Sequence, residues 1–270
     1  MDFAAESSAG PVETAAQTRV SWTRLVSEGA DEPAEQATAN DYDYDSFAEA
    51  YAAETETNLI NAYYTRPAIL DLAGDVAGRR VLDAGCGSGP LHAALRDRGA
   101  IVTGIDSSAK MLELARDRLG ADADLHLADL GSPLPFPDQT FDDVIASLVL
   151  HYLEDWTAPL AELRRVLTPG GRLIVAVDHP LVQKLVDPEA NYFATRQWSE
   201  EWTVGGQSAL MSFWHRPLHA MTDAFTTAGF RIAVISEPPP APGAHELFPD
   251  DLKDADSAFL CFLFFVLHAG

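Results

Sequence analysis

The sequence has few cysteines, few basic residues and no long hydrophobic run. Cys86 and Cys261 allow at most one disulfide bond, and because Cys86 lies inside a glycine-rich turn, both are expected to be reduced, buried thiols. No apolar stretch reaches the roughly 18 residues that a membrane-spanning helix requires. The chain starts without the basic and then apolar segments of a secretory signal, and no His, Cys or carboxylate spacing resembles a metal site. We therefore expect a cytoplasmic protein without a metal.

Basic residues are outnumbered by acidic ones, 18 to 41, which gives a formal net charge of −23. So negative a surface repels the phosphates of nucleic acids and anionic lipids, and the sequence therefore predicts neither nucleic acid nor membrane as a partner. Residues 1–40 are predicted to be an acidic, weakly ordered tail, and residues 41–270 to form one domain. The sequence leaves open whether the protein is a monomer or a homodimer.

Aromatic and aliphatic residues recur at helical spacing between residues 41 and 79, which predicts two helices before the first strand. They include Tyr44 and Tyr51. Two interpretations stay open for these tyrosines, namely packing in the core and closing over a ligand.

Residues 81–89, VLDAGCGSG, begin with an apolar run and end in a turn that contains three glycines. Glycine permits positive φ and a close approach of the main chain to a polar ligand, although three glycines alone also suit an ordinary turn. Strands are predicted at 80–84, 100–105, 124–128, 141–147, 172–177, 230–236 and 258–268, most of them separated by helices. This alternation predicts a doubly wound α/β fold whose ligand lies at the carboxyl ends of the strands, where Asp106 and Asp129 fall.

The segment after the fifth strand breaks this alternation. Residues 179–215 are rich in aromatic residues and contain Gly205 and Gly206 between two runs of about eight residues, which predicts a β-hairpin. The last strand is apolar throughout, so we place it inside the sheet.

The glycine turn differs from a dinucleotide-binding turn. Pro90 stands where the third glycine of G-x-G-x-x-G is required, and Asp83 at the mouth of the turn would face a diphosphate unfavourably. An acid there suits a ligand with an amino group, and Asp106 is placed to accept hydrogen bonds from ribose hydroxyls.

These residues resemble the class I S-adenosylmethionine (SAM) dependent methyltransferases. The resemblance covers residues 41–178 best, and the segments that carry it are 81–89, GIDSS at 104–108, Met111-Leu112, Ala128-Asp129, LPFPDQTFD at 134–142 and LRRVLTPGG at 163–171. The last two segments are similar to those of quinone-biosynthesis methyltransferases and of natural-product tailoring enzymes of secondary metabolism. The resemblance implies a Rossmann-like, mostly parallel seven-stranded sheet with an antiparallel last strand, lid helices over residues 41–79 and an aromatic-rich cap over 181–215.

The resemblance also implies which residues bind the cofactor, SAM, and its product S-adenosylhomocysteine. The cofactor-binding residues would be Asp83, Gly85, Gly87, Gly89, Asp106, Ser107, Met111, Asp129, Leu130, Ser147, Tyr44 and Tyr51. Those for the substrate, a small and partly apolar or aromatic molecule, would be Trp198, Trp202, Trp214 and Arg216.

A general base is needed only if the methylated O, N or C atom must lose a proton. His151, His179 and His215 all fall on the ligand side of the predicted sheet, and each could equally serve packing alone; His215 is preferred because it joins the cap to the next helix. The sequence also permits a SAM-binding protein on the same scaffold that catalyses a non-methylating reaction or acts as a regulator.

Overall fold

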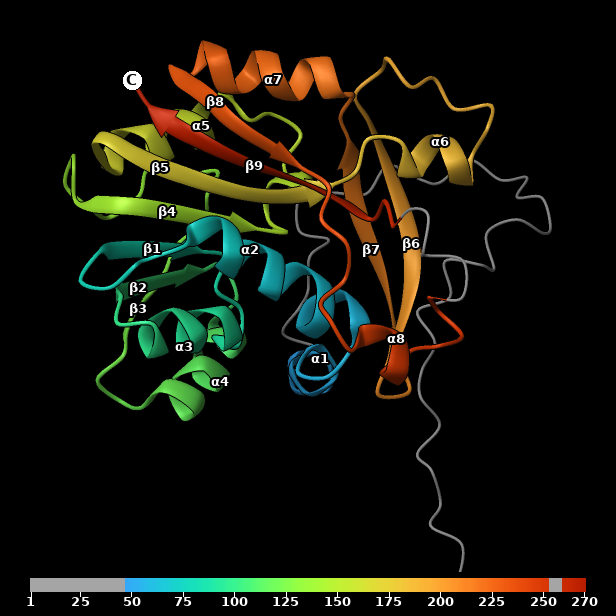
Figure 1. Cartoon of the computed structure of the whole chain (residues 1–270), viewed down its shortest axis with the longest axis horizontal. Coiled ribbons are helices and arrows are strands. Elements are labelled where there is room, and N and C mark those ends of the chain that lie inside the picture. Colours follow the sequence, from blue (N-terminus) through green and yellow to red (C-terminus); the bar gives the residue numbers. More distant parts are fainter. Residues whose placement is uncertain (1–46, 253–258) are drawn as a thin grey trace, which may run out of the picture.

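The computed structural model describes residues 47–252 and 259–270, so the predicted acidic tail and Tyr44 lie outside the described residues. Within them, seven strands form a sheet in the order β3-β2-β1-β4-β5-β9-β8 (Figure 1). The strands are β1 (Arg80–Ala84), β2 (Ile101–Asp106), β3 (Asp124–Leu127), β4 (Phe141–Ser147), β5 (Leu167–Asp178), β8 (Phe230–Ser236) and β9 (Phe262–Ala269). β9 lies between β5 and β8 and runs antiparallel to both, whereas the other neighbouring strands of this sheet are parallel to each other. This confirms the predicted fold class and the inner position of the last strand.

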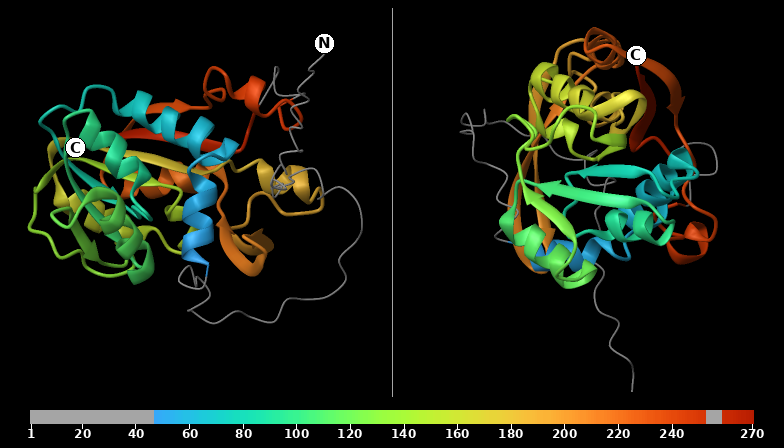
Figure 2. Two further views of the ribbon diagram at one scale, coloured as in Figure 1. Left: turned by 90° about the horizontal axis from the view of Figure 1, so that it is seen from below. Right: turned by 90° about the vertical axis from the view of Figure 1, so that its left-hand side faces the viewer.

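Helices cover both faces of the sheet (Figures 1 and 2). On one face lie α2 (Arg66–Ala73), α3 (Pro90–Asp97) and α4 (Ala109–Leu119), and on the other lie α5 (Thr157–Val166) and α7 (Leu218–Thr227). The strands therefore bury side chains on both sides. Phe264 and Phe265, which are adjacent in β9 and fully buried, belong to opposite cores.

Two helical segments precede the first strand, as predicted: α1 (Ala48–Thr55), and a π-helical segment, η3 (Leu59–Thr65), that continues directly into α2. The predicted start of the fifth strand was wrong. β5 begins at Leu167 rather than at Arg172, because the Pro-Gly-Gly segment before Arg172 forms an irregular part of the strand, with a register shift against β4. In addition, Cys261 is only half-buried, whereas Cys86 is buried as expected.

A buried ion-pair cluster ties the amino-terminal ends of the central strands together. Asp143 on β4 is 1% exposed and accepts hydrogen bonds from Arg79, just before β1, and from Arg172 on β5. Both guanidinium groups lower the pKa of this carboxyl against the raising effect of burial. The ionised carboxylate is thus fully compensated in the interior.

The insert after β5 contains a short helix, α6 (Val182–Val186), and a hairpin formed by β6 (Arg196–Val204) and β7 (Gln207–His215). The predicted Gly205-Gly206 turn is confirmed. Figure 1 shows the hairpin standing beyond the carboxyl end of β5, with α1 next to it. Two further short helices are η4 (Leu150–Tyr152) and α8 (Ala244–Leu247).

The hairpin and α1 share a small hydrophobic core of their own. Phe47 packs with Val204, Met211 and Phe213 in this core. The rings of Tyr51 and Trp202 stack nearly parallel, with a centroid separation of 6.1 Å. At the turn, a Cβ atom built on Gly205 would lie 2.6 Å from Cβ of Ala50. The predicted lid helix and the predicted cap therefore form one packed unit.

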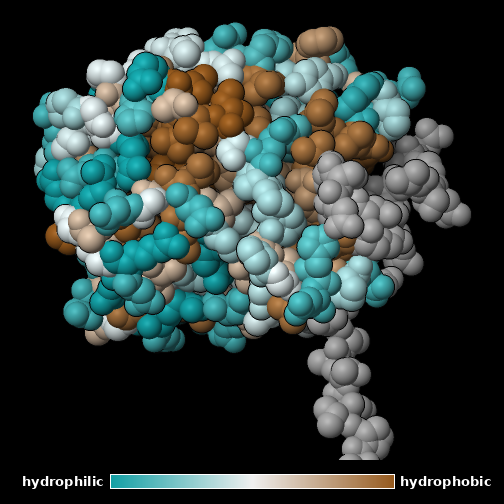
Figure 3. Space-filling model, viewed as in Figure 1, coloured by the Kyte–Doolittle hydropathy of each residue, from teal (hydrophilic) through white to brown (hydrophobic). Residues whose placement is uncertain are grey.

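Apolar side chains gather on one side of the molecule over β8 and β9 (Figure 3), where Val234 and Ile235 are 39% and 49% exposed. Among the described residues, no helix has the length and hydrophobicity to cross a membrane.

We predict that Gly205→Ala loosens both α1 and the hairpin, because its Cβ atom clashes with Ala50. Gly206→Ala is the matched control, since Gly206 also has positive φ but has nothing within 4 Å of an added Cβ atom. Both variants carry left-handed strain, and the clash should add about 1–3 kcal/mol of destabilisation to Gly205→Ala alone. Hydrogen–deuterium exchange should show faster exchange in α1 only for Gly205→Ala. Equal exchange in the two variants would contradict the contact.

Candidate active site

The glycine turn connects β1 to α3. Gly85, Gly87 and Gly89 all have positive φ, between 53° and 82°. A Cβ atom at Gly85 would lie 2.9 Å from Val149, and one at Gly89 would lie 2.9 Å from Leu119, whereas one at Gly87 would meet nothing within 4 Å. Positive φ favours glycine at all three positions; an added Cβ atom would also displace a neighbouring side chain at Gly85 and Gly89, whereas Gly87 leaves open space beside the main chain.

Asp83, in β1 just before the turn, is an acid buried without a cation. Its side chain is 2% exposed, and its Oδ2 atom has no hydrogen-bond partner among the described residues. Burial, and secondarily the negative charge of Asp106, raises the pKa of Asp83 to about 7. A cationic group placed here would relieve both effects.

Asp106, at the end of β2, lies across the turn from Asp83. Its Oδ2 atom accepts a hydrogen bond of 2.8 Å from the main-chain N–H of Gly87, and its Oδ1 atom accepts one from that of Ser108. Ser108 caps α4 by accepting a hydrogen bond from the buried Met111, and Ser107 is exposed. Asp106 is therefore held against the open side of the turn by these two main-chain donors.

The third acid, Asp129, follows β3 and is exposed, while the next residue, Leu130, is buried. Asp129 accepts a hydrogen bond from the main-chain N–H of Gly131 at 2.7 Å. The structure thus places the three predicted acids at the carboxyl ends of adjacent strands β1, β2 and β3.

The chain turns sharply after β4. Leu148, which follows Ser147, has a φ of +56°, an uncommon value for a residue with a side chain and one that typically marks a functional segment. The turn brings Val149 against Gly85 and leads into η4, which carries His151. His151 therefore lies two positions after Val149, the residue that packs against the glycine turn.

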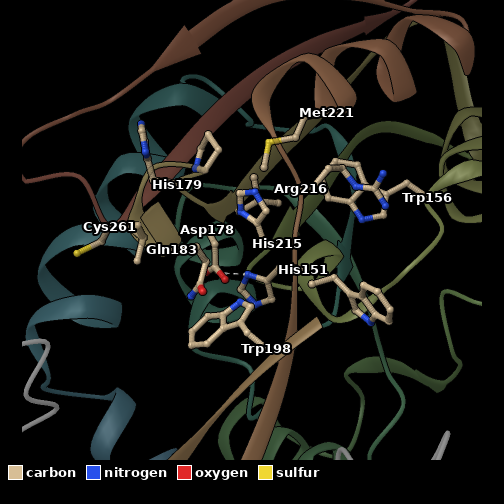
Figure 4. Close-up of a pocket in the computed structure, with 14 residues that line it drawn as sticks. His151, Trp156, Asp178, His179, Gln183, Trp198, His215, Arg216, Met221 and Cys261 are labelled. Carbon is tan, nitrogen blue, oxygen red and sulfur yellow. Dashed lines mark ion pairs between the residues drawn. The ribbon is translucent and has the colours of Figure 1, made fainter. Parts of the chain in front are cut away.

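A cavity of about 10 Å³ lies between the end of β5, the hairpin and α7. It has room for about one water molecule, so a ring-sized ligand can enter only if the lining residues move apart. The predicted residues His151, His179, His215, Trp198, Trp214 and Arg216 all line it, together with Trp156, Asp178, Gln183, Met221 and Cys261, among others (Figure 4). Residues up to 110 positions apart in the sequence, His151 and Cys261, thus share one site.

His151 has a carboxylate partner that the sequence analysis did not identify. Its Nδ1 atom lies 3.1 Å from Oδ1 of Asp178 at the end of β5, which is within ion-pair distance (dashed line in Figure 4), but the two atoms are not aligned as a hydrogen bond. Both side chains are largely shielded from solvent, with exposures of 6% and 22%. Asp178 occupies the same kind of position, the carboxyl end of a strand, as Asp106 and Asp129, so this signal was present in the sequence.

The other two histidines differ in whether a ring nitrogen is left to accept a proton. The Nδ1 atom of His179 accepts a hydrogen bond from the main-chain N–H of Leu181, and its Nε2 atom bonds Glu237 at 2.7 Å, so neither nitrogen can take a proton from a ligand. His215 donates from Nε2 to the carbonyl of Tyr192 at 2.9 Å, which leaves the lone pair on Nδ1. Burial lowers the pKa of His215, and the ring is therefore neutral at pH 7.

Trp202 is the one predicted substrate residue that does not line the cavity. It lies four residues beyond Trp198 on the same face of β6, about 13 Å along the strand, and stacks on Tyr51 instead. Among the described residues, no three His, Cys, Asp or Glu side chains are grouped as metal ligands.

Residues 82–175 match a protein-family model described as a methyltransferase domain. A demethylmenaquinone methyltransferase from Tropheryma whipplei is 35% identical over 142 residues, which cover 51% of this chain and 58% of that protein. The chain thus matches a little over half the length of this relative.

Solved structures share the fold over more of the chain. A SAM-dependent methyltransferase from Mesorhizobium loti is 26% identical with a TM-score of 0.57, covering 75% of this chain and 96% of that one. The [4+2]-cyclase SpnF, at 19% identity and a TM-score of 0.57, covers 83% and 93%. The fold therefore does not by itself define the reaction. The family match, the strand order and the acids around the glycine turn together identify the domain as a class I SAM-dependent methyltransferase domain.

Proposed function

We propose that this protein transfers a methyl group from SAM to an O, N or C atom of a small, partly aromatic molecule, and that this atom loses a proton to His151. The observation that carries the proposal is the juxtaposition of the SAM-type glycine turn with a histidine–carboxylate pair in an aromatic cavity. The turn after β4 joins the two, since Val149 packs on Gly85 and His151 lines the cavity.

The residues of the turn fit SAM. Asp83 offers a buried, unpartnered carboxylate oxygen to the amino group, and Gly87 leaves open space for the methionine end. Asp106 would accept hydrogen bonds from the ribose hydroxyls, with Asp129 and Leu130 at the adenine. When bound, SAM supplies an electrophilic methyl group on a positively charged sulfur and is released as S-adenosylhomocysteine.

His151 is the better base of the two histidines that keep a free nitrogen. Asp178 lies beside its Nδ1 atom and would stabilise the positive charge that forms when Nε2 takes a proton. His215 has a main-chain carbonyl as its partner instead. The ring of Phe213 packs against His151, Tyr152 and Trp198, and this aromatic cluster would exclude water from His151.

The SpnF likeness supports keeping one rival function, a non-methylating reaction on the same scaffold. Incubation with methyl-labelled SAM and a panel of phenols, amines and heterocycles separates the two. Label transfer with release of S-adenosylhomocysteine supports methyl transfer, and product formation without this release supports the rival.

For the cofactor site, we predict that Asp83→Asn weakens SAM binding about 10- to 100-fold, because it removes a charge-assisted contact. The pKa of Asp83 is raised in the folded protein, so the free protein loses stability as the pH rises from about 4 to 7, and the neutral asparagine should not lower stability at pH 8. Calorimetric titration and thermal unfolding measure the two effects.

Asp143→Asn is the matched control, since Asp143 is as deeply buried on the neighbouring strand but is paired with two arginines. It should cost about 3–5 kcal/mol of stability. A similar loss of stability in Asp83→Asn would indicate a structural role for Asp83.

For the base, we predict that His151→Asn lowers kcat by about 10²–10⁴ on any acceptor that the panel identifies. Asp178→Asn should lower kcat less than His151→Asn does, because the imidazolium that forms during the reaction loses its carboxylate partner. Asp178→Glu should restore part of the rate. His179→Asn should leave kcat nearly unchanged, and a larger loss in His215→Asn than in His151→Asn would overturn the assignment.

A further inference from the structure

The cavity next to His151 is lined by N–H donors that have no acceptor. Nε2 of Gln183, Nε1 of Trp198 and Nε of Arg216 are buried, and none of them donates a hydrogen bond to any described residue. A buried donor without an acceptor costs about 1–3 kcal/mol. Three such donors around one cavity indicate a ligand that presents acceptor oxygens.

Arg216 is the positive charge in this cavity. Its guanidinium group stacks over Trp156, with Cζ 4.6 Å from the ring centroid, and donates to the carbonyl of Glu154. Among the described residues, no carboxylate lies within ion-pair distance of it, although the sequence has 41 acidic residues. The side chain is thus held in place by neutral groups while its charge stays uncompensated.

None of the acids near the cavity forms an ion pair with Arg216. Asp178 is the one carboxylate among the lining residues, and it pairs with His151. Asp155 and Glu154 act on Arg216 only at longer range, and burial outweighs them, so that the pKa of Arg216 is lowered. An anion from the ligand would compensate the charge that the chain leaves uncompensated.

We propose that the methyl acceptor is an aromatic carboxylic acid whose carboxylate binds Arg216. A planar guanidinium matches a carboxylate geometrically, and the side chain of Trp198, which lies on the same face of the hairpin as His215, offers an apolar wall to a ring. Gln183 and Trp198 would donate to further ring oxygens. This inference rests on the proposed function, because it assigns the acceptor's charge at the same site.

The test is a calorimetric titration of the S-adenosylhomocysteine-loaded protein with the three isomeric hydroxybenzoates and, in parallel, the three hydroxybenzamides. At least one hydroxybenzoate should bind 10-fold or more tightly than its amide, since the two differ mainly in charge. Arg216→Gln should abolish this preference, and Arg216→Lys, which keeps the charge, should retain part of it. Arg164→Gln is the matched control, because Arg164 also donates to a main-chain carbonyl, that of Gly270, but lies outside the cavity.

Equal affinity for acid and amide, no binding of any hydroxybenzoate, or a preference that persists in Arg216→Gln would each overturn the proposal. The titration uses no turnover. Tight, Arg216-dependent binding of an acid without label transfer from SAM would therefore contradict the proposed methyl transfer while upholding the acceptor's charge.

Discussion

The buried carboxylate of Asp83 is the constraint around which the site is arranged. Two aspartates lie deep in neighbouring strands of this sheet, and the chain treats them differently. Asp143, at the amino-terminal ends of the strands, receives two arginines, whereas Asp83, at the carboxyl ends, receives no cation and has Asp106 beside it. The first arrangement stabilises the fold, and the second leaves an unfavourable charge that a cationic ligand removes.

The same contrast recurs in the cavity under the hairpin. There the uncompensated charge has the opposite sign, on Arg216, and the uncompensated hydrogen-bonding groups are donors. The two sites meet at the turn after β4, where the left-handed Leu148 directs Val149 to the glycine turn and His151 to the cavity. The helix α1, which was predicted to cover the cofactor, and the hairpin, which borders the cavity, form one packed unit.

The sequence predicted the fold closely because its signals are local. Alternating strands and helices, the glycine turn and the hairpin at Gly205-Gly206 each depend on neighbouring residues. The irregular start of β5 was missed because a Pro-Gly-Gly segment usually ends a helix, and pairing with β4 is a tertiary effect.

The sequence also predicted which histidines would reach the site but not which nitrogens would remain free. The partners of His179 and His215 come from residues 58 and 23 positions away, and no spacing rule predicts such contacts. Trp202 resembled Trp198 in type and strand face. Only the tertiary structure separates the cavity residue from the one that packs on Tyr51.

The central claim is that Asp83 holds the amino group of SAM, and proton release on binding tests it most directly. With a pKa of about 7, Asp83 is mostly protonated in the free protein at pH 6 and must ionise when a cation binds beside it. Calorimetric titrations with SAM at pH 6, in buffers of different ionisation enthalpy, should therefore show release of close to one proton per site. The release should vanish above pH 8 and in Asp83→Asn. SAM binding at pH 6 without proton release would contradict the account.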